Sequence, residues 1–135
     1  MAPRFEARIR IRSDADIVAA RRQGRALAEQ MGFSSTDVTV IATAISEVAR
    51  NIVQYAREGE VVVSATREDG RDGLTIVARD QGPGIADVVK AMQPGYSTAN
   101  SLGLGLPGAR RLMDDFEISS RVGEGTTVTM TKWQR

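Results

Sequence analysis

The sequence predicts an α+β fold, most simply one mixed β-sheet with helices packed on one of its faces. Three observations support this: a strand-like alternation at the amino end, two long helical patterns in the first half, and two pairs of strand-like runs closed by glycine turns. The 135 residues and the 41% hydrophobic content suit one ordinary globular domain with a full core. We therefore expect a single domain over residues 1–135.

The first predicted strand and the two long helices follow from periodicity and capping residues. Residues 5–12 alternate apolar and charged side chains, the period of a half-buried strand. The next helix is capped by Ser13 or Asp14 and ends at Gly32. A second helix begins at residue 34 or 35, carries an apolar stripe along one face, and ends near residue 55.

The remaining strands form two predicted hairpins. The first joins residues 60–67 to 73–79 through a polar turn that contains Asp69 and Gly70, and the second joins 116–122 to 126–133 through Gly-Glu-Gly. Between the hairpins we expect a short helix at 86–92, a lid over about 87–102 that is polar in its later part, and a helix from Pro107 to about residue 114.

Composition excludes several kinds of chemistry. Without cysteine the chain has no disulfide, thiolate nucleophile or zinc-thiolate site, and without histidine it has no Ser-His-Asp triad and no phosphohistidine of its own. The formal charge of +1 gives no global attraction to nucleic acid or membrane, so we expect neither as a partner. The first residues lack the apolar core of a signal peptide, so we expect a cytoplasmic protein.

A carboxylate and an amide stand four residues apart in the second predicted helix, at Glu47 and Asn51. This spacing places both on one face, about 40° apart around the axis and opposite the apolar stripe. Such a pair is typical of a solvated polar face. It also suits a site where Asn51 offers an oxygen to Mg²⁺ and Glu47 accepts a proton during attack on a γ-phosphate. The helix alone does not decide between these interpretations.

An Asp-x-Gly-x-Gly run follows a strongly apolar predicted strand, at Asp80, Gly82 and Gly84. A carboxylate at that place can accept a hydrogen bond from the exocyclic amine of adenine, and glycines allow a base or phosphate to approach the backbone. Asp, Gly and Pro also favour ordinary turns. The run is therefore compatible with a nucleotide loop and with a simple turn.

A third run, with glycines at Gly103, Gly105 and Gly108, satisfies the spacing G-x-G-x-x-G. We reject a Rossmann dinucleotide site because no strand directly precedes the run within a βαβ unit. The glycines still open a helix, whose first N–H groups can bind phosphate. The order of the three runs along the chain indicates an ATP site.

The chain resembles the GHKL, or Bergerat-fold, ATPases over nearly its whole length. The run from Glu47 to Asn51 looks like their N box, Asp80 to Gly84 like the G1 box, and residues 103–106 like the G2 box, while Thr126 stands where they place a last adenine-side threonine. More narrowly, these runs and Gly95–Thr98 resemble the RsbT-type switch serine/threonine kinases of bacterial stressosomes.

This resemblance implies a two-layer α/β sandwich of the Bergerat type and a serine/threonine kinase that uses ATP and Mg²⁺. Such kinases phosphorylate STAS-domain scaffold proteins of the stressosome, leave them, and activate a PP2C-type phosphatase in a stress or second-messenger pathway. Glu47 would be the general base and Asn51 the Mg²⁺ ligand. The other nucleotide-binding residues implied by the motifs are Asp80, Gly82, Gly84, Gly103, Leu104, Gly105 and Thr126.

Phosphoryl transfer also calls for a protein cation near the phosphates. Lys90, just before the later part of the predicted lid, is our first candidate, and Arg50, Arg110 and Arg111, which adjoin the motifs, are the others. Two other functions stay open: an anti-sigma factor serine kinase, and a non-catalytic, nucleotide-regulated partner-switching module. A sensor histidine kinase is excluded for this chain alone because it contains no histidine. Phe33, Tyr96 and Trp133 fit partner anchors or core packing equally.

Overall fold

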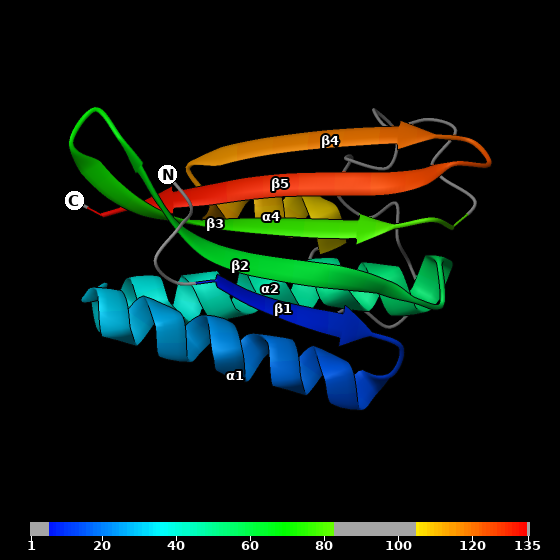
Figure 1. The fold of residues 1–135 in the computed structure, drawn as a ribbon, viewed down its shortest axis with the longest axis horizontal. Coiled ribbons are helices and arrows are strands. Elements are labelled where there is room, and N and C mark those ends of the chain that lie inside the picture. Colours follow the sequence, from blue (N-terminus) through cyan, green and yellow to red (C-terminus); the bar gives the residue numbers. More distant parts are fainter. Residues whose placement is uncertain (1–5, 83–104, 135) are drawn as a thin grey trace.

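The computed structural model describes residues 6–82 and 105–134 (Figure 1). Within these ranges the chain forms five strands and three helices, all of which match elements predicted from the sequence. The predicted short helix at 86–92 and the lid at about 87–102 lie outside the described residues. In chain order the elements are β1 (Glu6–Ile11), α1 (Asp14–Met31), α2 (Ser35–Tyr55), β2 (Gly59–Glu68), β3 (Arg71–Asp80), α4 (Gly105–Leu112), β4 (Asp115–Arg121) and β5 (Gly125–Trp133).

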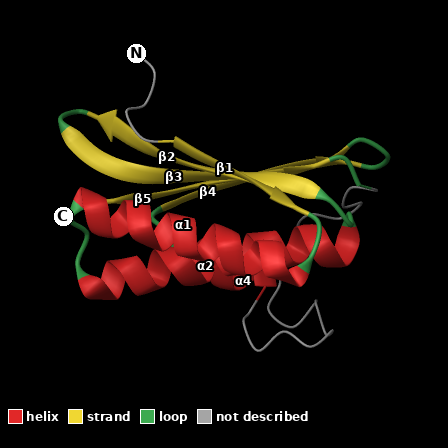
Figure 2. Ribbon diagram, turned by 60° about the horizontal axis from the view of Figure 1, so that its bottom comes forward, coloured by secondary structure: helices red, strands yellow, loops and turns green. Residues whose placement is uncertain are grey.

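The described elements form two layers. The strands make one five-stranded sheet in the order β1-β2-β3-β5-β4, and α1, α2 and α4 all lie on the same side of it (Figure 2). Among the described residues, no helix covers the opposite face of the sheet. The predicted α+β fold, with helices on one face, is confirmed.

The prediction of a mixed sheet was wrong, because every neighbouring pair of strands is antiparallel. One helix between two strands returns the chain for a parallel pairing, whereas α1 and α2 together reverse the chain once more, so β2 runs antiparallel to β1. Strand β4 runs in the same direction as β3, but β5 lies between them and is antiparallel to both. Hydrophobic periodicity predicts which residues form strands, but not which strands pair or in which direction they run.

The turn of the first hairpin is tighter than the sequence predicts. Asp69 and Gly70, with φ of 53° and 77°, form the two-residue connection between β2 and β3, and Glu68 pairs directly with Arg71. Two successive residues with positive φ match the right-handed twist of the flanking strands. The polar residues that we assigned to a longer turn therefore extend both strands.

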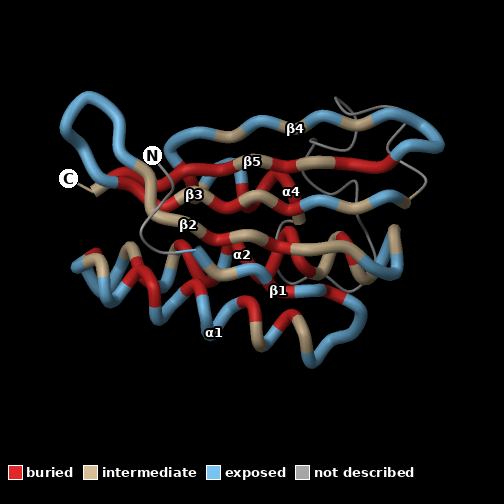
Figure 3. The backbone as a smooth tube through the Cα atoms, viewed as in Figure 1, coloured by how far each residue is buried: buried red, intermediate tan, exposed pale blue. Residues whose placement is uncertain are grey.

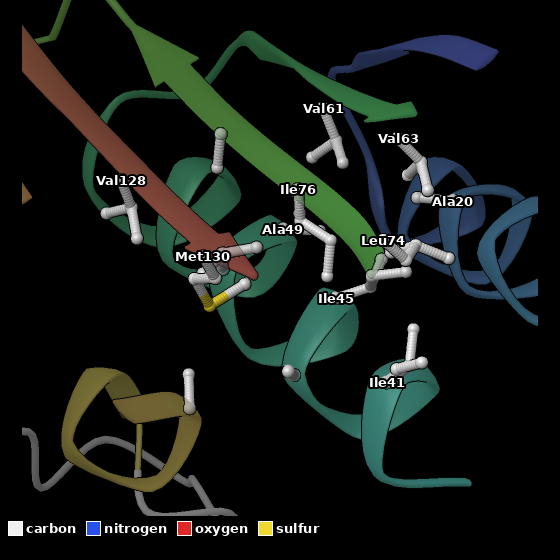
Figure 4. Close-up of a cluster of buried hydrophobic side chains, with 14 of the residues drawn as sticks. Ala20, Ile41, Ile45, Ala49, Val61, Val63, Leu74, Ile76, Val128 and Met130 are labelled. Atoms are coloured by element: carbon white, nitrogen blue, oxygen red, sulfur yellow. The ribbon is translucent and has the colours of Figure 1, made fainter. Parts of the chain in front are cut away.

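The core lies between the sheet and the helices. Side chains of α2 meet apolar residues of β2, β3 and β5, with α1 closing the side near β1 (Figure 4). Phe33 and Trp133 are both buried, and Phe33 belongs to this core, so the structure favours core packing for Phe33. The third candidate anchor, Tyr96, lies outside the described residues. The ring of Trp133 packs against Gly73 on β3, and its Nε1 donates a hydrogen bond to Asp115 at 2.7 Å. The guanidinium of Arg71 lies over this ring, 4.7 Å from its centroid.

Replacing Ser34 with alanine is expected to lower the free energy of unfolding by about 1 kcal/mol. Ser34 caps α2, and its Oγ accepts the N–H of Asp37 at 3.1 Å. The matched control is Ser13→Ala, since Ser13 caps α1 without a side-chain bond to the helix backbone. Urea unfolding measures both, and equal losses would contradict the role of the Ser34 bond.

Candidate functional site

Glu47 is a buried carboxylate that joins two helices. It lies near the middle of α2, and its side chain is 6% exposed. One oxygen, Oε1, accepts a hydrogen bond from Nη1 of Arg50 at 2.8 Å, and the other, Oε2, accepts the N–H of Gly105 at 2.8 Å. Both oxygens are therefore held, by a guanidinium from the same helix and by the first residue of α4.

The burial of Glu47 argues against a solvated polar face. Helix α4 packs against α2 and covers it with buried residues that include Leu106 and Ala109, so α2 is buried beyond the side that faces the sheet. Gly105 has φ of +63°, a backbone conformation that residues other than glycine rarely adopt, and its N–H donates a hydrogen bond to Glu47. The sequence of α2 alone could not reveal this covering helix.

Asn51 lies one turn beyond Glu47 on α2 and is partly exposed. Its amide oxygen is a hard, neutral ligand of the kind that Mg²⁺ accepts. No group of three or more acidic, histidine or cysteine residues gathers anywhere in ranges 6–82 and 105–134. Among the described residues, the single amide oxygen of Asn51 fits an ion whose other ligands are phosphates and water.

Asp80 ends β3 and lies in a row of residues across the end of the sheet. It pairs with Gly59 on β2 and with Thr126 on β5, so Asp80 and Thr126 are direct neighbours. Thr126 is buried, and its Oγ1 lies 2.8 Å from Oγ of Ser120 on β4. The structure thus brings together two predicted residues that are 46 positions apart in the chain (126 − 80).

The loop after Asp80 begins as a turn. Oδ1 of Asp80 accepts the N–H of Gly82 at 2.8 Å, which is an Asx turn. A Cβ on Gly82 would lie 2.6 Å from Cβ of Ala56, at the end of α2. Close packing therefore accounts for the glycine at position 82, and the second oxygen of Asp80 offers another acceptor.

The candidate site has two parts, one around Glu47 and the start of α4 and one around Asp80 and Thr126, and helix α2 connects them. Its last turn contacts the Asp80 loop through Ala56, which lies nine residues, or about 13 Å along the axis, beyond Glu47.

Of the other predicted site residues, Gly84, Lys90, Gly103 and Leu104 lie outside the described residues. Sequence reasoning missed Ser120 as the partner of Thr126 and Arg50 as the partner of Glu47, although the three-residue spacing from Glu47 to Arg50 indicates a helical ion pair.

A polar hollow of about 360 Å³ lies at the other end of the sheet, beside the turn between β2 and β3. It is lined mainly by charged side chains and includes the ring of Trp133. Because β3 runs from Arg71 beside this hollow to Asp80, the hollow is separated from the candidate site by the full length of that strand.

The sequence matches the family model of the histidine kinase-like ATPase domain over residues 12–132. The chain belongs to the histidine kinase-like ATPase family. This match runs from just before α1 to the last residue but one of β5, and it contains every residue of the site described above. It agrees with the ATP-binding fold that the three motifs indicate.

Two relatives show which proteins this histidine kinase-like ATPase resembles in sequence. The serine/threonine-protein kinase RsbT of Bacillus subtilis is 50% identical over 127 residues, which are 94% of this chain and 96% of RsbT. An anti-sigma F factor of Caldanaerobacter subterraneus subsp. tengcongensis is 36% identical over 118 residues, 84% of this chain and 82% of that factor. The predicted enzyme class, a serine/threonine protein kinase, is confirmed by the first relationship.

A solved structure supports the fold of this histidine kinase-like ATPase. The RsbU and RsbW domains of Rv1364c from Mycobacterium tuberculosis match with a TM-score of 0.65 and 22% identity, covering 99% of this chain and 34% of that longer chain.

Within the described residues, neither long helix is apolar enough over its length to cross a membrane.

Proposed function

We propose that this kinase transfers the γ-phosphoryl group of ATP to a serine or threonine of a STAS-domain scaffold protein. The observation that carries the proposal is the buried carboxylate of Glu47 on α2. It accepts two hydrogen bonds, one of them from the N–H of Gly105 at the start of α4. A helix N-terminus favours an anion, so the same place suits phosphate oxygens. A fixed carboxylate there is positioned to accept the proton of the attacking hydroxyl.

The remaining residues have complementary roles in this proposal. Asn51 would hold Mg²⁺, which neutralises phosphate charge when bound. Asp80, in the row with Thr126, would accept a hydrogen bond from the adenine amine. Adenine would then lie at the end of the sheet and the phosphates beside α4, with α2 spanning the distance between them.

The high identity to RsbT supports a switch role in a bacterial stress or second-messenger pathway. In this role the kinase leaves the phosphorylated scaffold and activates a PP2C-type phosphatase. The relationship to anti-sigma F factors favours a second candidate, a serine kinase that also sequesters a sigma factor. Copurification with a sigma factor would favour this second function.

The first experiment incubates the purified protein with labelled Mg-ATP and a STAS-domain protein encoded in the same genome. We expect label on a serine or threonine of the STAS protein and its loss in Asn51→Ala. ATP binding without transfer to any STAS protein of that genome would contradict the proposed substrate and favour a non-catalytic partner switch. A parallel assay with the cognate PP2C-type phosphatase tests activation.

Replacing Asp80 with asparagine is expected to weaken ATP binding by about 10- to 100-fold, since a lost charge-assisted hydrogen bond is worth roughly 1.5 to 3 kcal/mol. Asparagine can still accept the N–H of Gly82, but it then presents an NH₂ group where adenine needs an acceptor. Calorimetric titration measures the affinity. The control is Asp72→Asn at the other end of β3, where the carboxylate is 53% exposed, and equal affinities for both variants would exclude Asp80 from adenine recognition.

A further inference from the structure

The ion pair between Arg50 and Glu47 differs from the other ion pairs in the described part of the chain. In those pairs the side chain of the acidic partner is 22–67% exposed, whereas the side chain of Glu47 is 6% exposed. The most buried of the others, Lys132 with Asp114, has side chains 10% and 22% exposed. Pairs with both members exposed contribute little to stability, because water screens them. A buried carboxylate depends on its partners for both charge and orientation.

Arg50 fixes the orientation of this carboxylate. Its guanidinium donates to Oε1 at 2.8 Å, across three residues of the same rigid helix. With Oε1 held in this way, Oε2 is directed to the N–H of Gly105 at the start of α4. A carboxylate oxygen has two lone pairs, so Oε2 can accept one further hydrogen bond from a substrate hydroxyl.

We infer that Arg50 is a positioning residue for phosphoryl transfer, an inference that rests on the proposed function. During transfer the substrate hydroxyl gives its proton to Oε2 of Glu47, its oxygen forms the new bond to the γ-phosphorus, and the bond to ADP breaks. Arg50 keeps its protons throughout and donates to Oε1. It acts through Glu47, by keeping Oε2 aimed at the reacting hydroxyl.

This role makes Arg50 distinct from a phosphate-binding cation. A cation that contacts phosphates contributes to ATP affinity directly, whereas a residue that acts through Glu47 affects the rate of transfer. The side chain of Arg50 is 37% exposed, so methionine can replace its apolar stem without leaving a closed cavity. Lysine keeps the charge and can reach Glu47 with a single donor group.

The test is a double-mutant cycle in the transfer assay with the full chain. It compares Arg50→Met, Glu47→Gln and the double variant, and adds Arg50→Lys. We expect Arg50→Met to lower kcat by about 10- to 100-fold, with KM for ATP changed less than about threefold, and Arg50→Lys to recover part of the loss. In the Glu47→Gln background, Arg50→Met should change the residual rate by less than about twofold, because the two residues act as a unit.

Matched controls come from an exposed helical ion pair. Arg25 and Glu29 on α1 lie 3.6 Å apart, with both side chains at least half exposed. Arg25→Met and Glu29→Gln should leave kcat within about twofold of the unchanged protein. Far-UV circular dichroism and thermal unfolding confirm that each variant is folded.

The outcomes separate the two proposals. Equal losses from Arg50→Met in both backgrounds, or a change confined to KM for ATP, would overturn the positioning role while leaving the kinase function intact. Absence of transfer by the unchanged protein would overturn the proposed function and this role with it. If the rate of Glu47→Gln lies below detection, Glu47→Asp replaces it, since the shorter side chain cannot reach both donors.

Discussion

Replacing Glu47 with glutamine is expected to lower the rate of phosphoryl transfer by about 10²- to 10⁴-fold, the usual contribution of a positioned general base. Glutamine has nearly the same shape, and its oxygen can accept the N–H of Gly105. Its NH₂ group would face the guanidinium of Arg50 and cannot accept a proton. Single-turnover transfer of labelled phosphate to the proposed STAS-domain substrate measures the loss.

Binding must be separated from chemistry in this variant. We expect ATP affinity to stay within about tenfold, because Glu47 is not assigned a contact with the nucleotide. The control is Glu29→Gln on α1, where the side chain is 60% exposed. If Glu47→Gln transferred phosphate as fast as the control, Glu47 would not be the general base. Activation of the proposed PP2C-type phosphatase by this variant would show that kinase activity and phosphatase activation are separable.

Replacing Gly125 with alanine is expected to lower the free energy of unfolding by about 3 kcal/mol or more, for two independent reasons. Its φ of +108° is one that L residues rarely adopt. A Cβ at this position would also collide with the backbone carbonyl of Asp80 and lie 2.8 Å from Cα of Gln81. Because backbone atoms cannot swing aside as a side chain does, the end of the sheet would have to move.

The control for this variant is Gly123→Ala in the same turn. Gly123 has φ of +82°, and nothing lies within 4 Å of the position that a Cβ would occupy. Gly123→Ala should lower the free energy of unfolding only by the cost of the left-handed backbone conformation, about 1 to 2 kcal/mol. Urea unfolding of both variants gives the difference, and thermal unfolding should show Gly125→Ala lower by roughly 10 °C than the unchanged protein. Equal losses would contradict the close contact with Asp80.

The described elements were predictable because their signals are local. Alternation in β1, the capping serine and terminal glycine of α1, and the periodicity of α2 each depend on neighbouring residues, so the bounds agree within one or two positions. The direction of neighbouring strands was not predictable from such signals. It depends on the path of the whole chain, and the two helices between β1 and β2 produced antiparallel pairing where we expected a mixed sheet.

The candidate site shows the same division more sharply. The motif order along the chain was sufficient to indicate an ATP site with Glu47, Asn51 and Asp80 as candidates, because residue types and their spacing are written directly in the sequence. The kinase activity was predicted from the resemblance of these motifs to a known family. Only the tertiary structure decided that α4 buries Glu47, that Arg50 and Gly105 hold its two oxygens, and that Thr126 lies beside Asp80. Burial and pairing are properties of surfaces that meet across long stretches of chain, and helical periodicity describes only one helix at a time.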